Sequence, residues 1–489
     1  MDQNPAETSQ TTRRSFVKLA AASALLASNS AKGAWAQSSA DRVAPISDLP
    51  SLDGELAFDD VARQSAAMDW GFHLRRVPLA VLRPRSIDDI VRMVIYANKR
   101  GIKIAMRGQG HSEYGQALVE GGIVIDSSTL KALRLDGSDA VDAQPGATWG
   151  DVAKVTLGQG LITPVVPGSM LLSVGGTLSV GGTGETSYRY GAQVDHVLEM
   201  DVVTGAGELV TCSEEHNSEL FRMTLAGLGQ CGMIVRARLR LIQAPKFVVM
   251  HELTYDDMDS FFSDQARLTM IDELGPLNGR ITKNQNGSPQ FVLLAGNGVA
   301  EAGEVSRQPA WMAGLRFKSD APAKTMPYWE YLNRGTAGQT AAKASGKPNP
   351  SLVATLPDNS VQDFLGHLLS TPEAFIGIWF FEVSPKVNAR HKQPLQKMPS
   401  GLLSFELRMQ RRASATDAPD HKAMLLMNDT LLPRVQAAGG KIYPPFAPIL
   451  SREQWQEHYG SETWQRFAAA KKQFDPINVL TPGAGIFSA

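Results

Sequence analysis

The spacing of apolar residues in the first half of the chain predicts short strands that alternate with helices. Residues 79–82 and 102–106 have the apolar content of strands, and apolar residues recur at helical spacing over 87–95. Ser86 is suited to cap the start of this helix and Gly101 to end it. The pattern therefore predicts a strand, helix, strand unit that leads into a glycine-rich loop.

The same patterns continue along the chain, and the composition shifts toward Met, Pro and scattered charge between residues 247 and 441. There the aromatic run 379–381 either roofs a flat substrate or packs in a strand core. Residues 336–350, rich in Ala, Gly and Lys, are expected to form an exposed loop. Other expected elements are a strand at 122–126, a helix at 149–157 capped by Thr148, a hairpin of 199–203 with 208–212, a helix at 217–225, and strands at 291–295, 375–383 and 402–409.

The amino terminus has the pattern of an export signal. Arg13 and Arg14 precede an apolar run at residues 19–27, and Ala34-Trp35-Ala36 matches a small-x-small cleavage site. The run is about half of the ~20 residues needed to cross a bilayer, which argues against stable membrane insertion. Residues 1–36 resemble a twin-arginine signal, so a periplasmic or secreted protein is expected.

Composition bounds the partners. With 489 residues, 43% of them hydrophobic, the chain is expected to form about two domains. A net charge of −1 predicts no nucleic-acid partner and favours a small-molecule substrate. Two cysteines, and nine histidines without the spacing of metal ligands, predict no metal site.

Two glycine-rich stretches indicate a cofactor site. Residues 106–117 hold three glycines around His111, and no amphipathic helix opens at those glycines, which argues against a Rossmann fingerprint. Residues 173–184 hold five glycines, which suits either a wall beside a flat cofactor or a tight turn between strands.

The first stretch, at 107–112 and 115–117, resembles the FAD loop of cytokinin dehydrogenases in the vanillyl-alcohol-oxidase superfamily of flavoproteins. Segments at 201–232 and 480–487 resemble the same family in the same order. The resemblance implies an α+β fold in which a two-part, PCMH-type FAD-binding domain contains an inserted α+β substrate domain. The implied bounds are 37–245 for the FAD-binding domain (core about 74–245), 246–440 for the substrate domain and 441–489 for the return to the FAD-binding domain.

The resemblance also implies that FAD is attached covalently through His111. The alternative is a surface-loop histidine that only forms hydrogen bonds. The FAD contacts that the family pattern implies are Gly108, Gln109, Gly110, His111, Ser112, Gln116, Ser173, Ser179, Thr183, Met233, Tyr443 and Thr481.

The chain departs from the family at the positions that matter for proton removal. Gly168 stands where the family has an aspartate base, and Asn278 stands where it has a partnering glutamate. Gly377 and Ala484 likewise replace a family asparagine and glutamine. A base contributes typically ~10²–10⁴-fold, so its loss needs a substitute.

Candidate substitutes are Glu406 with Arg408, which alternate with apolar neighbours on a predicted strand, and Glu185 in the second glycine stretch. The alternative for each is a solvated strand or loop face.

The predicted function is an exported FAD-dependent oxidoreductase. It would oxidise a C–H bond next to O or N in a small aromatic or allylic substrate by hydride transfer to flavin N5. Electrons would then pass to O₂ or to a periplasmic redox partner. Two alternatives stay open: a cytokinin dehydrogenase acting on N⁶-isoprenoid adenines with a displaced base, and a flavin-carrying binding or electron-transfer protein.

Overall fold

The structure is a computed structural model that describes residues 48–303 and 309–487. Residues 50–489 form one compact unit. The predicted export signal at 1–36 lies outside the described residues. Within the described ranges, no helix combines the length and the apolar content that crossing a membrane requires.

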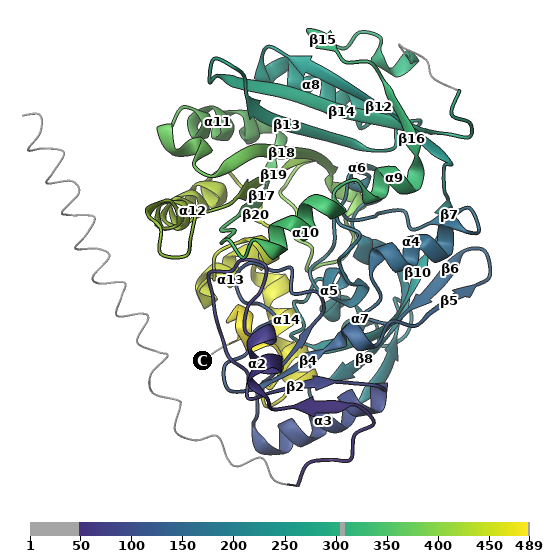
Figure 1. The fold of residues 1–489 in the computed structure, drawn as a ribbon, viewed down its shortest axis with the longest axis vertical. Helices are drawn as coiled ribbons and strands as arrows, with labels where there is room; N and C mark the ends of the chain where they lie inside the picture. Colours follow the sequence, from purple (N-terminus) through teal and green to yellow (C-terminus); the bar gives the residue numbers. More distant parts are fainter. Residues whose placement is uncertain (1–47, 304–308, 488–489) are drawn as a thin grey trace, which may run out of the picture. The chain divides into compact units, whose positions relative to one another are not determined.

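The first sheet builds the predicted strand, helix, strand unit (Figure 1). Helix α3 (Ile87–Arg100) begins with a capping box between Ser86 and Asp89, and it ends at Gly101 in the left-handed conformation, as predicted. Strands β2 and β3 both pair in parallel with β4, so β3 directs its carboxyl end toward the glycine-rich loop. The sheet has the order β1 (Glu55–Ala57), β2 (Ala80–Arg83), β4 (Ile123–Asp126) and β3 (Ile104–Arg107), and α2 (Asp60–Ala66) packs against β2.

The second sheet is antiparallel and contains the predicted hairpin, β8 with β9. Helix α4 (Trp149–Leu157) has the predicted bounds because Thr148 forms a capping box with Asp151. The strand order is β5 (Leu133–Asp136), β6 (Ala140–Ala143), β10 (Gly232–Arg240), β8 (Val197–Thr204) and β9 (Leu209–Cys212); β7 (Leu161–Ile162) pairs with β11 (Ile242–Gln243), and α7 is Ser218–Thr224.

The second glycine-rich stretch begins as a helix, so the expectation of a tight turn between strands is wrong there. Residues Val174–Leu178 form α5, and Ser187–Tyr190 form α6. A Cβ atom at Gly175 would lie 2.7 Å from the Cβ of Pro145, so only glycine allows this close packing. The remaining glycines, at 181–184, run from α5 toward α6.

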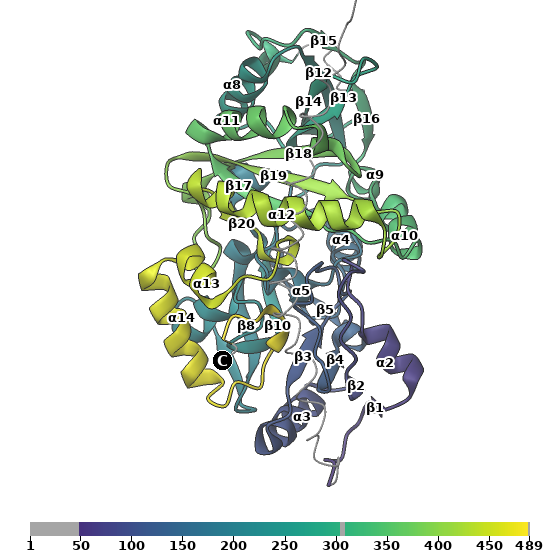
Figure 2. The ribbon, with the colours of Figure 1, turned by 90° about the vertical axis from the view of Figure 1, so that its left-hand side faces the viewer.

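A nine-stranded antiparallel sheet forms the rest of the unit (Figure 2). The strands predicted at 291–295, 375–383 and 402–409 are present as parts of β14, β18 and β19. The order is β15 (Ser319–Asp320), β12 (Phe247–Tyr255), β14 (Pro289–Val299), β13 (Leu277–Lys283), β18 (Ile378–Val387), β19 (Leu403–Arg411), β17 (Leu352–Pro357) and β20 (Lys441–Ile442), with β16 (Lys324–Pro327) pairing with β12.

Helices cover one face of this sheet. Phe405 of β19 packs edge to face on Phe262 of α8 at a centroid distance of 4.8 Å. Neighbouring residues of β19 point to the other face, which is therefore turned away from α8. The covering helices are α8 (Met258–Leu268), α11 (Asp358–Leu369) and α12 (Pro419–Ala437).

Residues 336–350, expected to be an exposed loop, contain helix α10 (Thr336–Ala344) after α9 (Tyr328–Asn333). Four of the nine residues of α10 are alanines, the residue with the strongest helix propensity, which overrides its glycine. The loop expectation is therefore wrong over the first part of this segment.

The carboxyl terminus returns to the first two sheets. Helix α14 (Ser461–Phe474), which follows α13 (Arg452–Tyr459), packs against α7. Leu480 forms a bridge with Ile104 of β3, and the backbone N–H of Thr481 donates to the Ile104 carbonyl at 2.7 Å. The chain end is thereby joined to the strand that precedes the first glycine-rich loop.

Candidate active site

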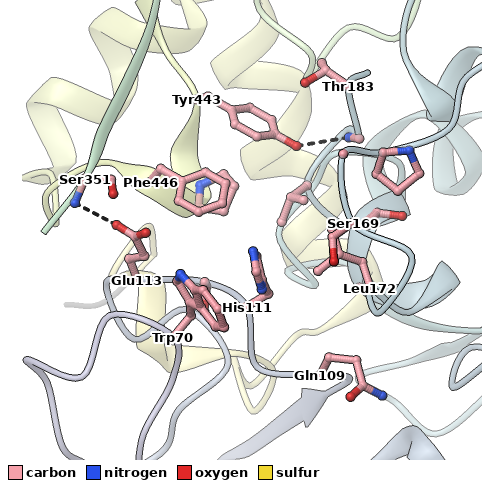
Figure 3. Close-up of a pocket in the computed structure, with 18 of the residues that line it drawn as sticks. Trp70, Gln109, His111, Glu113, Ser169, Leu172, Thr183, Ser351, Tyr443 and Phe446 are labelled. Carbon is pink, nitrogen blue, oxygen red and sulfur yellow. Dashed lines mark hydrogen bonds between the residues drawn. The ribbon is translucent and has the colours of Figure 1, made fainter. Parts of the chain in front are cut away.

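A single cavity of about 620 Å³ lies between the two glycine-rich stretches and the face of the nine-stranded sheet that is turned away from α8. Figure 3 shows Gln109, His111 and Thr183 of the two glycine-rich stretches at this cavity. All twelve residues that the family pattern implies as FAD contacts line this cavity, from Gly108 to Thr481. The three candidate catalytic residues, Glu185, Glu406 and Arg408, line it as well. The chain therefore assembles the predicted cofactor residues and the predicted catalytic residues in one place.

The first glycine-rich loop has the features of a phosphate or ring cradle. Within the described part of the chain, the backbone N–H groups of residues 109–112 donate no hydrogen bond to the protein. A Cβ atom at Gly108 would lie 2.0 Å from the Oγ of Ser173, so the absence of a side chain at Gly108 lets Ser173 of the second stretch pack directly against the first. Unpaired amides beside a cavity fit an anionic cofactor such as FAD.

His111 points into the cavity from this loop (Figure 3). Its ring stacks on Trp70 at a centroid distance of 4.3 Å and meets the edge of Phe446 at 6.1 Å. Burial lowers the pKa of His111 to about 3, and the nearby charges of Arg408 and Lys343 add to this effect. The imidazole is therefore neutral at physiological pH.

A buried turn next to Trp70 holds the loop in place. The carboxylate of Asp69 accepts hydrogen bonds from the backbone N–H of Gly115 at 2.6 Å and of Gly71 at 3.0 Å. The Trp70 N–H donates to the carbonyl of Ser112 at 2.9 Å. Burial raises the pKa of Asp69 to about 6 despite these hydrogen bonds. This turn fixes the direction in which His111 projects.

Glu113, next to His111, ties the loop to the substrate side. Its Oε2 accepts from the backbone N–H of Ser351 at 2.8 Å, and its own N–H donates to the Pro445 carbonyl at 3.0 Å. The side chain is buried, and burial raises the pKa of Glu113 well above its ordinary value. Burial therefore favours the protonated form of Glu113 more than it would at an exposed position.

The remaining predicted FAD residues belong to elements that are far apart in sequence. The hydroxyl of Tyr443 accepts from the backbone N–H of Gly182 at 3.2 Å. The amide of Gln116 donates to Pro444, while its Oε1 is buried without a partner in the described structure. Thr481 donates to the carbonyl of Gly229 at 3.0 Å. A buried acceptor such as Gln116 Oε1 is expected to be satisfied by a ligand.

The opposite wall is formed by residues of three neighbouring strands, all of them polar except Phe380. Because side chains alternate along a strand, residues two apart on β13, β18 and β19 face the cavity together, and residues between them, such as Leu407, pack in the core. This polar wall consists of Asn278, Arg280, Phe380, Glu382, Ser384, Lys386, Glu406, Arg408 and Gln410.

The same alternation divides the aromatic run 379–381. Phe381 is fully buried in the core, whereas Phe380 lines the cavity. The strand-core expectation is therefore right for Phe381, and the substrate-roof expectation stays a prediction for Phe380.

Glu406 lies at the centre of the polar wall and not on a solvated face, because only 6% of the residue is exposed. Its carboxylate accepts from the Thr183 hydroxyl at 3.4 Å and lies 4.0 Å from Lys386 and 3.5 Å from Arg408. Burial alone would raise the pKa of Glu406, but the charges of Lys386 and Arg408 hold it below its ordinary value. The carboxylate is therefore ionised at neutral pH, and burial lowers the pKa of Lys386.

Glu185, the other candidate, is held by the substrate side of the cavity. Its carboxylate pairs with Arg334 at 2.6 Å and accepts a short hydrogen bond from Tyr331. The amide of Asn278 donates to Glu185 at 3.4 Å and to Glu382 at 2.8 Å. Asn278 thus links two carboxylates at the position where the family has a glutamate.

The place of the missing aspartate is open. A Cβ atom built on Gly168 would have no neighbour within 4 Å. Gly377 also lines the cavity, but a Cβ atom there would lie 2.1 Å from Met424. Ala484 is buried and is not among the residues that line the cavity.

Sequence patterns did not predict the contacts of Asp69, Glu113, Glu382 and Lys386. The positions of Glu382 and Lys386 could have been predicted in part, because they alternate with core residues along β18. Those of Asp69 and Glu113 could not, since their roles depend on which segments approach them in space.

Family models match both parts of the chain. One model, described as an FAD binding domain, matches residues 78–213. Another, described as cytokinin dehydrogenase 1, FAD and cytokinin binding, matches residues 300–487. With the cradle and the polar wall in one cavity, these matches define an FAD-dependent oxidoreductase of the PCMH type, with a cytokinin-binding type of substrate domain.

Individual relatives agree with this class. The chain is 31% identical to an uncharacterized oxidoreductase, ORF5 in the fasciation locus of Rhodococcoides fascians, over 87% of this chain and 97% of that protein. It is 31% identical to cytokinin dehydrogenase 4 of Oryza sativa subsp. japonica, over 89% and 90%. The chain belongs to the family of FAD-dependent oxidoreductases that includes the cytokinin dehydrogenases.

The solved structure of 6-hydroxy-D-nicotine oxidase from Arthrobacter nicotinovorans has the same fold. The TM-score is 0.68 at 22% identity, covering 89% of this chain and 97% of that one. The predicted α+β fold and the predicted FAD-binding domain are confirmed. Membership of a family of FAD-dependent oxidoreductases favours an enzyme over a flavin carrier without an organic substrate.

Proposed function

We propose that this protein oxidises a C–H bond next to oxygen or nitrogen in a small aromatic or allylic substrate, and that it does so outside the cytoplasm. The observation that carries the proposal is the position of the polar wall, which faces the flavin cradle across one cavity. When bound, FAD supplies the hydride acceptor at its N5 atom. The protein supplies binding, orientation and proton handling.

We further propose that FAD is attached covalently through His111. The imidazole is neutral, and among the described residues it makes no hydrogen bond that would occupy a ring nitrogen. The stack on Trp70 and the Asp69 turn hold the ring in one direction. A neutral, oriented and unpaired imidazole is what a nucleophilic attachment point requires.

Proton removal from the substrate falls to the charged centre of the polar wall. Glu406 is ionised and lines the cavity, so it can accept a proton from a substrate hydroxyl. The guanidinium of Arg408, 3.5 Å from Glu406, stabilises negative charge that develops on that oxygen. A phenol or alcohol needs less help from a base than an amine does, which favours oxygen-bearing substrates.

The cavity leaves room for an aromatic ring near Gly168, where no side chain fills the space of the family's aspartate. Export rests on the twin-arginine pattern of residues 1–36. An exported enzyme must pass its electrons to an acceptor outside the cytoplasm, and we propose O₂ or a periplasmic redox partner.

A second candidate is a cytokinin dehydrogenase with a displaced base. The match of residues 300–487 to a cytokinin-binding model favours it. Glu185 and Glu382, both hydrogen-bonded to Asn278, are the carboxylates that would then replace the family's acid pair.

Anaerobic bleaching of the flavin separates the two candidates. Coniferyl-type allylic alcohols, benzylic alcohols and phenols are compared with isopentenyladenine at equal concentration, with flavin absorbance as the readout. The proposal predicts faster bleaching by the alcohols and phenols. Rapid bleaching by isopentenyladenine would instead support the cytokinin dehydrogenase candidate.

A further inference from the structure

Arg280 is a cation of the polar wall that has no anionic partner. It lies on β13 and lines the cavity. Among the residues that the structure describes, its side chain forms no ion pair and no hydrogen bond, and its Nε is buried without a partner. The guanidinium lies over the ring of Phe380, 5.1 Å from the centroid.

The nearest acidic residue along the sheet is directed elsewhere. Glu382 of β18 stands directly opposite Arg280 in the strand register, a position from which the two side chains could meet. Glu382 instead accepts from Asn278 at 2.8 Å and pairs with Arg408 at 3.7 Å. The ion pair that the register allows is therefore not formed.

The other charged side chains near Arg280 have partners. Three carboxylates are paired with cations, and the pairs are Glu185 with Arg334, Glu382 with Arg408, and Glu406 with Lys386. Arg411 is engaged by the side chain of Asn428 and the carbonyl of Met424. The guanidinium of Arg280 is left without a carboxylate in a partly buried site.

We propose that Arg280 binds a carboxylate of the substrate, so that the substrate is an organic acid whose oxidisable C–H bond lies away from that carboxylate. This proposal rests on the proposed function, because it concerns the substrate of the same cavity. A guanidinium presents a planar fork of donors that matches a carboxylate, and withdrawing it from water without an anion is unfavourable. A substrate carboxylate supplies the missing partner, and Phe380 supports the guanidinium from its ring face.

The test uses the purified holoenzyme and a matched pair of unreactive ligands. Benzoate and benzamide have nearly the same shape, but only benzoate carries a charge, and calorimetry measures the binding of each without turnover. The wild type is expected to bind benzoate at least tenfold more tightly than benzamide. In Arg280→Met this preference is expected to fall by roughly 10- to 100-fold, the range for hydrogen bonds to charged groups.

Lys283→Met is the matched control. Lys283 lies on the same strand, is exposed, and is not among the cavity residues, so this variant removes the same charge from the same region. It is expected to keep the preference for benzoate, whereas Arg280→Lys is expected to retain part of it. Equal loss in Lys283→Met and Arg280→Met would overturn the proposal, as would a wild type without any preference.

A parallel bleaching assay separates this proposal from the proposed function. 4-(Hydroxymethyl)benzoate is expected to reduce the flavin at lower concentration than benzyl alcohol. If neither alcohol bleaches the flavin but benzoate is still preferred through Arg280, the proposed alcohol oxidation fails and the carboxylate site stands. If both alcohols bleach equally and benzoate is not preferred, the carboxylate site fails and the oxidation stands.

Discussion

Replacing Lys386 by Met removes one charge from the buried pair with Glu406. The lysine is 2% exposed, and its Nζ lies 4.0 Å from the carboxylate. At that distance the attraction is about 4 kcal/mol for an effective dielectric constant of about 20. The variant no longer has to desolvate Lys386, and Arg408 remains 3.5 Å from Glu406, so part of the loss is recovered. We expect Lys386→Met to lower the free energy of unfolding by about 2 kcal/mol at pH 8.

The effect has a definite pH dependence. In the wild type the pKa of Glu406 is depressed, so its contribution to stability is present above the unfolded pKa and is lost only as pH falls through the folded pKa. In Lys386→Met, burial is less opposed and the pKa of Glu406 rises. Protonation then relieves the buried charge as the pH falls, so the difference between wild type and variant should be smaller at pH 5 than at pH 8.

Urea denaturation of the holoenzyme, followed by tryptophan fluorescence at pH 5 and pH 8, measures the difference in the free energy of unfolding between wild type and Lys386→Met. The matched control is the double variant Lys386→Met/Glu406→Gln, in which no unpaired charge remains. The double variant should be less destabilised than the sum of the two single variants, because the singles each leave one charge without its partner. Additive losses, or a loss that is the same at pH 5 and pH 8, would refute the coupling.

Three further predictions concern the cavity, the loop and the signal. Gly168→Asp should fold, because the Cβ position is open, and it should speed bleaching by isopentenyladenine on the order of 10²-fold; no acceleration would show that the aspartate alone does not restore the base. The pKa of Asp69 is raised to about 6, so its carboxyl lowers stability as the pH rises from about 4 to about 6, and Asp69→Asn should flatten this part of a pH profile of thermal midpoints; an unchanged slope would assign it to another group. Replacing Arg13 and Arg14 together by Lys should trap the precursor in the cytoplasm, as fractionation would show, and an unchanged periplasmic yield would contradict the twin-arginine assignment.

Local signals predicted the elements around the cradle well. Ser86, Gly101 and Thr148 mark helix ends through hydrogen bonds or backbone conformations that involve only near neighbours in sequence. The glycine-rich loop likewise carries its own signature. Because such local patterns can be recognised in the sequence, the family resemblance identified residues that the structure brings to the cavity from both ends of the chain.

The polar wall could not be predicted to the same extent, because it joins β13 to β18 and β19, which lie far from it in sequence. The pairing of β13 with β18 places Arg280 opposite Glu382, and no local pattern specifies that pairing. Helix α10 was missed for a different reason. The expectation of a loop gave more weight to the glycine and lysine residues of this segment than to its alanines, which favour a helix. The role of Asp69 depends on the approach of Gly115, which is remote from it in sequence.

The most direct measurement is whether FAD is attached covalently to His111. A single result then tests three statements: that the first glycine-rich loop binds the cofactor, that the neutral His111 imidazole is the attachment point, and that the cofactor is FAD. The protein is precipitated with acid, washed and digested with trypsin, and the peptide of residues 108–131 is weighed by mass spectrometry, with His111→Ala as the control. This peptide is expected to carry the mass of FAD in the wild type and not in His111→Ala. Yellow colour that washes entirely into the supernatant, with an unmodified 108–131 peptide, would contradict covalent attachment.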